Sequence, residues 1–300
     1  MKVIITGATG FVGQNLSQYL ISKSIDVEQI SLRQQNWKEN INLQANAIIH
    51  LAGKAHDTAN TSAEEEYFRI NRDLTKLLFN EFLRSEISDF LYFSSVKAVA
   101  DTVEGVLTED VIGEPLTAYG KSKLEAENFL LSQKLPEGKR VFIIRPCIIH
   151  GPCNKGNLNL LFKIVEKGIP WPLGAFENKR SFLSIDNLNF IIYQILMNED
   201  IESGIYNFAD DQAISTNNLI QIITKTLDKK SRLWKIPQKY LEITARMGDK
   251  FHLPLNSERL KKLTESYVVS NQKIKSAIKV DSLPITTEQG LIKTIKSFIK

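Results

Sequence analysis

Cysteine and other metal-binding residues are scarce in this sequence. The 300 residues include only two cysteines, Cys147 and Cys153, and they form no CxxC pair. The four histidines do not have the spacing that metal ligands usually show. We therefore expect neither a disulfide scaffold nor a metal site. The low cysteine content is typical of proteins in the reducing cytoplasm, where we expect this chain to work.

Long apolar runs and dense charge clusters are also missing. No apolar stretch approaches the ~20 residues needed to cross a bilayer. The opening MKVIITGATG has no basic segment before a long apolar one, so we expect no signal peptide. The net charge is +4, with basic residues spread along the chain and enriched only from Lys225 onward. Because a nucleic-acid or membrane surface needs denser clustering, we expect neither as a partner.

Short apolar runs alternate with longer helical patterns in the first half of the chain. Five runs rich in β-branched or aromatic residues are typical of strands buried on both faces: 3–6, 27–32, 47–52, 90–95 and 141–146. Helix-length stretches lie between them at 11–22, 64–85 and 117–134. This alternation predicts right-handed βαβ units and an α/β fold with a parallel sheet. The link 33–46 is short and polar, which predicts no full helix there.

The pattern loosens from about residue 155. Two short runs, 180–185 and 204–209, are strand candidates. The sequence predicts helices near 187–198, 216–228, 238–249, 271–278 and 287–299. We expect a smaller C-terminal region packed against the carboxyl edge of the sheet, because open α/β sheets bind ligands at that edge.

Three glycines, Gly7, Gly10 and Gly13, stand between the first predicted strand and the first predicted helix. A turn that leaves a strand needs unusual dihedral angles, and a missing Cβ lets the backbone approach a pyrophosphate. The start of the helix, at Phe11 and Val12, offers N–H groups and the positive end of the helix dipole to phosphates. The strand–turn–helix context predicts a dinucleotide-binding loop.

The GxxGxxG spacing, in TGATGFVG, resembles the extended short-chain dehydrogenase/reductase superfamily, also described as the NAD-dependent epimerase/dehydratase family. The resemblance implies a Rossmann-like, doubly wound parallel sheet that binds NAD(P) in residues 1–153. It also implies a smaller nucleotide-sugar region in 154–300, interleaved with the first. Family members often form homodimers through the helices that match 64–85 and 117–134, so we expect a homodimer.

Further motifs extend this resemblance on the cofactor side. The stretch HLAG, at 50–53, resembles the motif that runs past the dinucleotide, which implies cofactor contacts for Leu51, Ala52 and Gly53. Asn71 matches an asparagine that braces the active-site strand through backbone groups. The second predicted strand ends in SLRQQ, without the acid that usually binds the ribose 2′-hydroxyl of NAD. Arg33 can pair there with a 2′-phosphate, which favours NADP(H) over NAD(H), although a surface arginine remains an alternative.

Tyr119 and Lys123 are four residues apart on a predicted helix, so their side chains share one face. A free tyrosine has a pKa of about 10, and a usable base near pH 7 needs a shift of roughly 3 units. A neighbouring ammonium and a positive nicotinamide ring can supply that shift in a cleft. The family resemblance makes Tyr119 and Lys123 catalytic and cofactor-binding residues. We expect Glu125 and Glu127, on the same helix, to be solvated.

A hydroxyl group at the end of the fourth predicted strand completes this constellation. By resemblance Ser95 is the third catalytic residue and also contacts substrate, with Ser94 as the next best candidate. Dehydratases of the family carry an Asp–Glu pair just after this hydroxyl, where this chain has Val96 and Lys97. We therefore do not expect this protein to be a dehydratase. By the same resemblance, Val96 is expected to contact substrate.

The second half of the chain points to the substrate. RPCIIHGP (145–152) resembles the turn RPxxxYGP, with His150 in place of tyrosine. Residues 154–188 resemble a bacterial subgroup labelled UDP-glucose 4-epimerase-like, which includes 4-ketoreductases making UDP-N-acetyl-quinovosamine or -fucosamine for surface polysaccharide. The resemblance implies that Arg180 holds the UDP diphosphate, with Asn157 and Arg259 as further substrate contacts.

Three functions stay open at this point. The absence of an acid after the second strand and the subgroup resemblance favour an NADP(H)-dependent reductase of a UDP-4-keto-6-deoxy-HexNAc. A UDP-glucose or UDP-N-acetylglucosamine 4-epimerase shares the hydride step and is the alternative. A non-catalytic NAD(P)-binding sensor or assembly protein is a third possibility, which the retained Ser95, Tyr119 and Lys123 disfavour.

Overall fold

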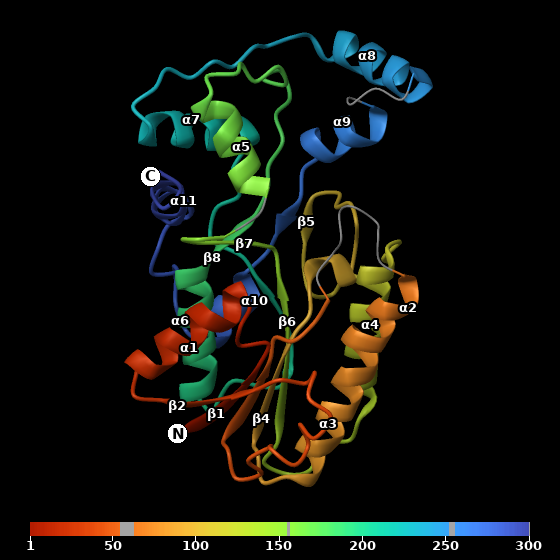
Figure 1. The fold of residues 1–300 in the computed structure, drawn as a ribbon, viewed down its shortest axis with the longest axis vertical. Helices are drawn as coiled ribbons and strands as arrows, with labels where there is room; N and C mark the ends of the chain where they lie inside the picture. Colours follow the sequence, from red (N-terminus) through yellow and green to blue (C-terminus); the bar gives the residue numbers. More distant parts are fainter. Residues whose placement is uncertain (55–62, 155–156, 252–255, 300) are drawn as a thin grey trace.

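The computed structural model describes residues 1–54, 63–154, 157–251 and 256–299, and a parallel six-stranded sheet forms its centre (Figure 1). The strands are β1 (Lys2–Thr6), β2 (Asp26–Ile30), β3 (Ala47–His50), β4 (Asp89–Phe93), β6 (Arg140–Pro146) and β9 (Gly204–Phe208). Their order is β2-β1-β3-β4-β6-β9, so the chain reverses direction across the sheet between β1 and β3. The predicted α/β fold and parallel sheet are confirmed.

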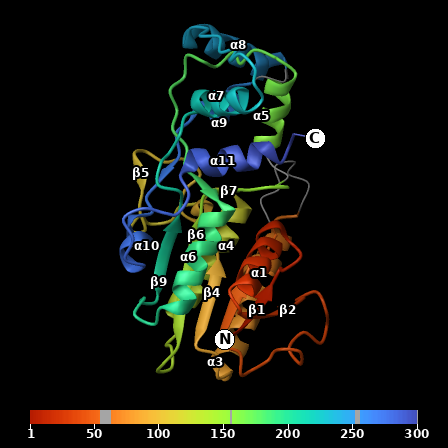
Figure 2. The ribbon, with the colours of Figure 1, turned by 90° about the vertical axis from the view of Figure 1, so that its left-hand side faces the viewer.

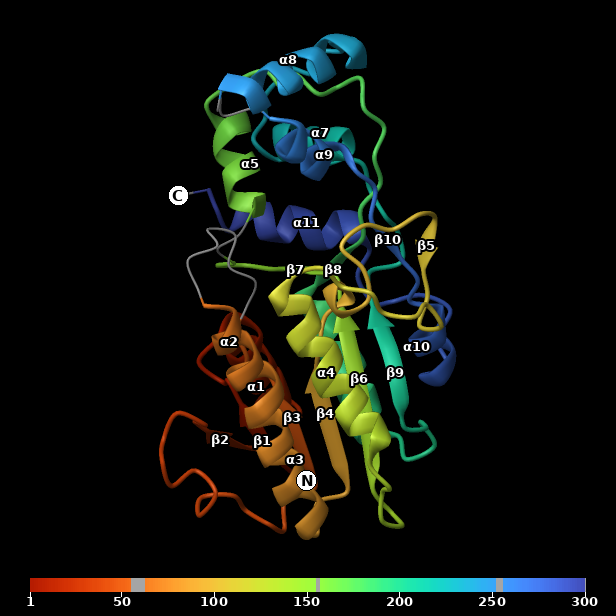
Figure 3. The ribbon, with the colours of Figure 1, turned by 90° about the vertical axis from the view of Figure 1, so that its right-hand side faces the viewer.

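Helices cover both faces of the sheet. Figure 2 shows α1 (Phe11–Ser22) and α6 (Ile185–Met197) on one face. Figure 3 shows α3 (Leu74–Arg84) and α4 (Ala118–Ser132) on the other. Successive strand residues point to opposite faces, and neighbours such as Ile4 and Ile5 are both fully buried, in different hydrophobic clusters. Burial on both faces explains why the central strands appear in the sequence as continuous apolar runs. For 27–32 the prediction of burial on both faces is wrong, because β2 is an edge strand and only Ile30 in it is buried.

The predicted helix 64–85 is continuous but not uniform. It consists of α2 (Glu64–Tyr67), a π-helical turn η1 (Phe68–Asp73) and α3. Single π turns inside helices often mark functional sites. Between β2 and β3 the chain forms only turns, as the short polar link predicted.

The C-terminal region lies beyond the carboxyl ends of the sheet strands (Figure 1). Its helices are α5 (Asn157–Glu166), α7 (Thr216–Thr226), α8 (Gln238–Phe251), α9 (Ser257–Thr264) and α11 (Thr287–Lys296), whereas α10 (Gln272–Ala277) packs beside β9 at the edge of the sheet. Two small parallel sheets pair β7 (Ile148–His150) with β8 (Phe182–Ser184) and β5 (Val106–Leu107) with β10 (Val268–Val269). The strands β5, β7 and β10 and the helices α5 and α9 escaped prediction, because two- and three-residue strands and short helices leave little periodicity to read.

The two halves of the chain share one core. β9 pairs with β6 at the edge of the main sheet, and α6 packs against α1, although both elements follow residue 154. A separate hydrophobic cluster, with Trp171, Leu219 and Leu291 among its members, lies within the C-terminal region. None of the helices in the described ranges combines the length and the apolar character that a membrane span requires.

Candidate active site

In the glycine loop after β1, Gly7 and Gly13 stand where the surrounding backbone leaves no room for a side chain. Gly7 has φ +72°, and a Cβ there would lie 2.6 Å from the backbone nitrogen of Ala52. A Cβ on Gly13 would lie 2.5 Å from the carbonyl oxygen of Gly7. At Gly10 the nearest atom to an added Cβ would be that same carbonyl oxygen, 3.3 Å away, and no other atom of the described residues outside its chain neighbours would lie within 4 Å. Because Gly10 has no side chain, space is left open in front of the N-terminus of α1.

This open space faces the N-terminus of α1. No side chain caps the helix at Gly10, and its first turn, which begins at Phe11 and Val12, carries no acidic residue. The first N–H groups of a helix lack partners within it and attract anions. The loop also lies at the crevice between β1 and β3, where open α/β sheets bind dinucleotides. These residues fit a dinucleotide diphosphate.

A chain of buried hydrogen bonds braces the strand ends below the loop. The hydroxyl of Thr75 donates to the carbonyl oxygen of Asn71 (2.7 Å), so it accepts from Nε2 of His50 (2.9 Å). Nδ1 of His50 then accepts from the hydroxyl of Thr6 (2.7 Å). Burial lowers the pKa of His50 to about 3, with Lys123 as a second cause. His50 is thus a neutral structural link between β1, β3 and α3.

Asn71, Gly53 and Lys123 meet beside this link. The side chain of Asn71, fully buried in η1, accepts from the backbone nitrogen of Lys54 (2.8 Å) and donates to its carbonyl oxygen (3.1 Å). It also donates to the hydroxyl of Ser122 (3.0 Å). A Cβ on Gly53 would lie 3.2 Å from Nζ of Lys123. Asn71 therefore ties the segment after β3 to α4.

Helix α4 brings Tyr119 and Lys123 to the carboxyl end of β4. The Thr117 hydroxyl caps the helix by accepting from the backbone nitrogen of Gly120 (3.2 Å). A Cβ on Gly120 would lie 2.4 Å from the carbonyl oxygen of Lys97, so the helix docks closely on the 3-10 turn η2 (Val96–Ala98). Nζ of Lys123 donates to the carbonyl oxygen of Phe93 (2.8 Å), the last residue of β4.

Ser95 and Tyr119 are hydrogen-bonded through their side chains. Burial raises the pKa of Tyr119, and the bond to Ser95 partly opposes that rise. The ring of Tyr67, which the sequence did not single out, packs edge-on against that of Tyr119 at 6.3 Å. Burial also lowers the pKa of Lys123 to about 8, against the opposing effect of Glu127. In the protein without its cofactor, burial therefore favours the protonated phenol, whereas the lowered pKa predicted from the sequence needs the positive nicotinamide ring as well.

Glu127 was expected to be solvated, and that expectation is wrong. The residue is fully buried, and its carboxylate accepts from Nη2 of Arg145 at 2.5 Å and from the hydroxyl of Ser94. A charge can be buried here because it is paired and hydrogen-bonded. The bond also separates the two serines: Ser94 points to Glu127, while Ser95 points to Tyr119. Glu125, by contrast, is partly exposed in an ion pair with Arg72.

The residues expected to bind substrate are less tightly grouped. Val96 is buried in η2, next to Ser95. The half-buried guanidinium of Arg180 donates to the carbonyl oxygens of Glu265 (3.3 Å) and Lys262, at the end of α9. Burial lowers the pKa of Arg180. Arg180 therefore holds α9 against the main body here.

Three further predicted contacts lie at the periphery. Arg259 is exposed in the first turn of α9, where its backbone nitrogen donates to Asn256 (2.8 Å). Arg33 is exposed in the turn that follows β2. Asn157 is the first residue of α5, and its side chain lies outside the described part of the structure.

Tyr267 connects the C-terminal region to the site, and sequence reasoning missed it. Its hydroxyl lies 2.8 Å from the carbonyl oxygen of Ala100 and 3.1 Å from that of Val96. Nζ of Lys97 stacks over its ring at 4.4 Å. Burial raises the pKa of Tyr267. The segment before β10 is thereby fixed over the turn that carries Ser95.

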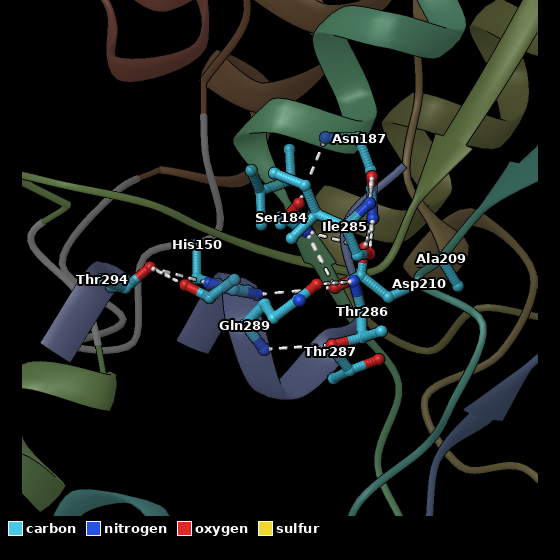
Figure 4. A network of polar contacts seen from close by, with 12 residues as sticks. His150, Ser184, Asn187, Ala209, Asp210, Ile285, Thr286, Thr287, Gln289 and Thr294 are labelled. Carbon is cyan, nitrogen blue, oxygen red and sulfur yellow. Dashed lines mark hydrogen bonds and ion pairs between the residues drawn. The ribbon is translucent and has the colours of Figure 1, made fainter. Parts of the chain in front are cut away.

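His150, the residue that replaces tyrosine in the RPxxxYGP turn, lies in a buried polar network (Figure 4). Nδ1 lies 2.9 Å from the hydroxyl of Thr294 on α11, and Nε2 lies 3.6 Å from Oδ2 of Asp210. The carboxylate of Asp210 accepts from the backbone nitrogen of Ser184 (3.0 Å) and from the side chain of Asn187 (2.7 Å). The network joins α11 to the ends of β7, β8 and β9.

Known proteins resemble this chain in sequence. The sequence profile of the NAD dependent epimerase/dehydratase family matches residues 3–209. A UDP-glucose 4-epimerase of Vibrio cholerae is 31% identical over 262 residues, which cover 79% of this chain and 78% of the relative. An N-acetyl-alpha-D-glucosaminyl-diphospho-ditrans,octacis-undecaprenol 4-epimerase of Escherichia coli O157:H7 is 27% identical, over 98% of this chain and 94% of the relative.

The fold also resembles solved structures. That of RMD from Pseudomonas aeruginosa, complexed with NADPH, has a TM-score of 0.75 at 21% identity and covers 99% of this chain and 98% of its own. The family is NAD(P)-dependent, and the cofactor that suits the glycine loop is NAD(H) or NADP(H). Because the family match extends over more than two thirds of the sequence, this chain belongs to the NAD dependent epimerase/dehydratase family.

Proposed function

We propose that this protein is a 4-ketoreductase that uses NADP(H) to reduce a UDP-linked 4-keto-6-deoxy-N-acetylhexosamine for surface polysaccharide synthesis. The observation that carries the proposal is the phenol of Tyr119, hydrogen-bonded to Ser95 and one helical turn from Lys123. A carbonyl that receives a hydride needs a proton at its oxygen, and the hydroxyl of Tyr119 can donate that proton.

The side chains divide the reaction between them. The nicotinamide, when bound, supplies the hydride to C4. Tyr119 gives its proton to the C4 oxygen, and the hydroxyl of Ser95 orients that oxygen beside the phenol. Lys123 stands ready to bind the nicotinamide ribose and to stabilise the phenolate that remains. Arg33 is proposed to select NADP(H), since the chain has no acid after β2 to bind a ribose 2′-hydroxyl.

Substrate binding is assigned to the C-terminal region. Arg180 would hold the diphosphate, because a guanidinium matches phosphate oxygens with two parallel hydrogen bonds. It would have to exchange its present carbonyl partners at the end of α9 for the phosphates. Asn157, Val96 and Arg259 are proposed as further substrate contacts.

A 4-epimerase is the second candidate, and the two relatives favour it. Both are 4-epimerases by name, one of UDP-glucose and one of a sugar carried on undecaprenyl diphosphate. An epimerase would need Tyr119 to take a proton from the C4 hydroxyl and later return it. The sugar diphosphate is common to all these substrates, so the proposed role of Arg180 is the same for each.

The cofactor of the purified protein distinguishes the two reactions. For the reductase we expect NADPH consumption that depends on a UDP-4-keto-6-deoxy-HexNAc, and little cofactor after purification. Tightly bound NAD, together with interconversion of UDP-sugars without added nucleotide, would instead establish the epimerase. Binding of dinucleotide with turnover of neither substrate class would point to a non-catalytic sensor or assembly protein.

We also propose that two copies pair through the outer faces of α3 and α4. Leu77 on α3 and Leu131 on α4 expose 41% and 54% of their surface, on helices that pack side by side. The expected homodimer should be visible by light scattering of the purified chain. Leu131→Glu should convert it to a monomer, and Ile21→Glu on α1, which is as exposed, should not.

A further inference from the structure

Helix α8 carries a stripe of large apolar side chains that face away from the protein. Tyr240, Ile243, Met247 and Phe251 expose 64%, 46%, 53% and 60% of their surface. Their spacing of three, four and four residues places all four side chains on one face of the helix. Four such residues in an unbroken row differ from the scattered apolar residues of an ordinary protein surface.

A different face of α8 attaches the helix to the molecule. Leu241, Ala245 and Gly248 are buried, and the first two belong to the hydrophobic cluster of the C-terminal region. At 100° per residue the middle of this buried face lies about a third of a turn from the middle of the stripe. Figures 1–3 all show α8 at the outer end of the molecule, farthest from the sheet. The exposed stripe therefore belongs to a helix at the outer end of the molecule, which a flat surface can approach from outside.

The charged residues of α8 are also divided between its faces, with basic residues beside the apolar stripe and acidic residues nearer the attached face. Lys239, Arg246 and Lys250 follow one another at seven and four residues, and their row borders the apolar stripe. The two acids of the helix, Glu242 and Asp249, lie beyond that row, toward the attached side. The carboxylate of Asp249 is hydrogen-bonded to the backbone nitrogen of Ser257 (3.0 Å). The outer surface thus combines an apolar stripe with a positive border.

The surrounding sequence has the same sign of charge. Residues 225–262 contain eleven lysines and arginines against four aspartates and glutamates, a net charge of +7, whereas the whole chain carries +4. The rest of the chain is therefore slightly acidic. The sequence suggested that these basic residues were too dispersed for a membrane surface, but the structure gathers three of them, Lys239, Arg246 and Lys250, along one edge of α8.

We propose that α8 is a membrane-docking helix that lies flat on an anionic lipid bilayer. Its stripe would enter the boundary between headgroups and acyl chains, and its basic border would face the anionic headgroups. A helix of this kind has a strong apolar face, low overall hydrophobicity and lysine or arginine beside aromatic residues, all of which α8 has. The proposal goes beyond the reaction and holds for a reductase and an epimerase alike.

Vesicle flotation with the full chain tests the proposal. We expect the protein to float with vesicles of phosphatidylcholine and phosphatidylglycerol at two to one, and much less with phosphatidylcholine alone. High salt should release it, because screening weakens the attraction to the headgroups. Each basic residue at such a surface contributes about a fivefold change in binding. The triple change Lys239→Gln, Arg246→Gln and Lys250→Gln should therefore weaken binding by roughly a hundredfold.

The apolar stripe has its own variants and control. Ile243→Ser with Met247→Ser should abolish flotation at all salt concentrations, while Ile21→Ser with Met197→Ser, equally exposed on α1 and α6, should not. Circular dichroism and the melting temperature show whether each variant is folded. In the variant M247W, the added indole fluorescence should shift to the blue when anionic vesicles are added.

Several results would overturn the membrane assignment. One is a folded wild-type chain that stays in solution with anionic vesicles. Another is self-association that Ile243→Ser and Met247→Ser remove without any vesicle binding, which would make the stripe an interface between copies. Binding of an oligonucleotide in place of vesicles, lost in the lysine and arginine variant, would assign the basic border to nucleic acid. None of these results depends on catalytic activity, so failure here and failure of the proposed reaction can be told apart.

Discussion

At the scale of single residues, Tyr119 should carry the proton transfer whichever direction the reaction takes. Tyr119→Phe keeps the ring against Tyr67 but removes the hydroxyl that bonds Ser95. We expect kcat to fall by about 10²- to 10⁴-fold, the usual contribution of a positioned acid or base. Dinucleotide affinity, measured by fluorescence titration, should hardly change. Tyr193→Phe serves as the control, and wild-type turnover by Tyr119→Phe would refute the assignment.

Lys123 should leave a pH signature in the stability of the cofactor-free protein. Burial lowers its pKa from 10.5 to about 8, so between these values the unfolded chain binds a proton that the folded chain does not. The free energy of unfolding then rises with pH across this window, by about 3 kcal/mol, because the cost of burying a charged lysine disappears. Below pH 8 that cost is constant. Urea titrations of the wild type and of Lys123→Met should differ by this pH dependence, since the other groups cancel. Parallel curves would mean that Lys123 titrates near its ordinary pKa.

The parts of the site that lie in local sequence motifs were predictable, and the parts that depend on contacts between distant residues were not. The glycine loop, Ser95, Tyr119 and Lys123 lie in local patterns, so the sequence could place them on adjacent elements. Glu127 could not be read correctly, because its partner Arg145 is 18 residues away on β6. A glutamate on a helix is usually solvated. Only the fold shows that this face of α4 turns inward.

At the scale of elements, the central strands were predictable as continuous apolar runs, and the long helices were predictable because their burial is periodic. The π turn that holds Asn71 was not, since the hydrogen bonds between the Asn71 side chain and Lys54 and Ser122 join segments far apart in the chain and leave no mark in the pattern of apolar residues. The short strands β5 and β10 exist only through their pairing with each other, across about 160 residues of chain. A local pattern carries no sign of such a pair.

The glycine loop offers an element-scale test that separates packing from binding. Gly13→Ala would place a Cβ 2.5 Å from the carbonyl oxygen of Gly7, so we expect the free energy of unfolding to fall by about 2 kcal/mol or more. At Gly10 the closest atom would be 3.3 Å away, so Gly10→Ala should leave the cofactor-free protein nearly as stable as the wild type.

In a cofactor titration, Gly10→Ala, the more stable of the two variants, should be the one that loses affinity for the dinucleotide. Gly10→Ala fills the approach to the N-terminus of α1, and we expect its affinity for dinucleotide to fall by roughly tenfold or more. Calorimetric titration with NADPH and with NAD measures this loss. Unchanged affinity in Gly10→Ala would show that the diphosphate does not approach the helix at this residue.

At the scale of the whole molecule, the boundary near residue 154 does not separate two folding units. The sequence suggested a cofactor-binding part and an interleaved substrate part. In the structure β9 is the outer strand of the main sheet, next to β6. The Tyr267 hydroxyl and the His150–Asp210 network add polar links between the parts. We infer that neither part is stable without the other.

A truncated chain of residues 1–153 tests this inference. It lacks α6, whose Leu188, Ile191, Ile192 and Ile195 are fully buried. At about 2 kcal/mol for each buried side chain, their loss removes about 8 kcal/mol, which is comparable to the whole stability of a typical domain. β6 would also become an exposed apolar edge that can pair with other chains.

We therefore expect residues 1–153 to aggregate, or to lack near-ultraviolet circular dichroism, and the full chain to unfold in one step. Equal calorimetric and van't Hoff enthalpies for the full chain would establish that single step. A monomeric fragment with a cooperative melt and a binding site for dinucleotide would contradict the inference. In that case the first half would be a domain of its own, and the contacts of α6 and β9 would serve to orient the substrate region and not to complete a shared core.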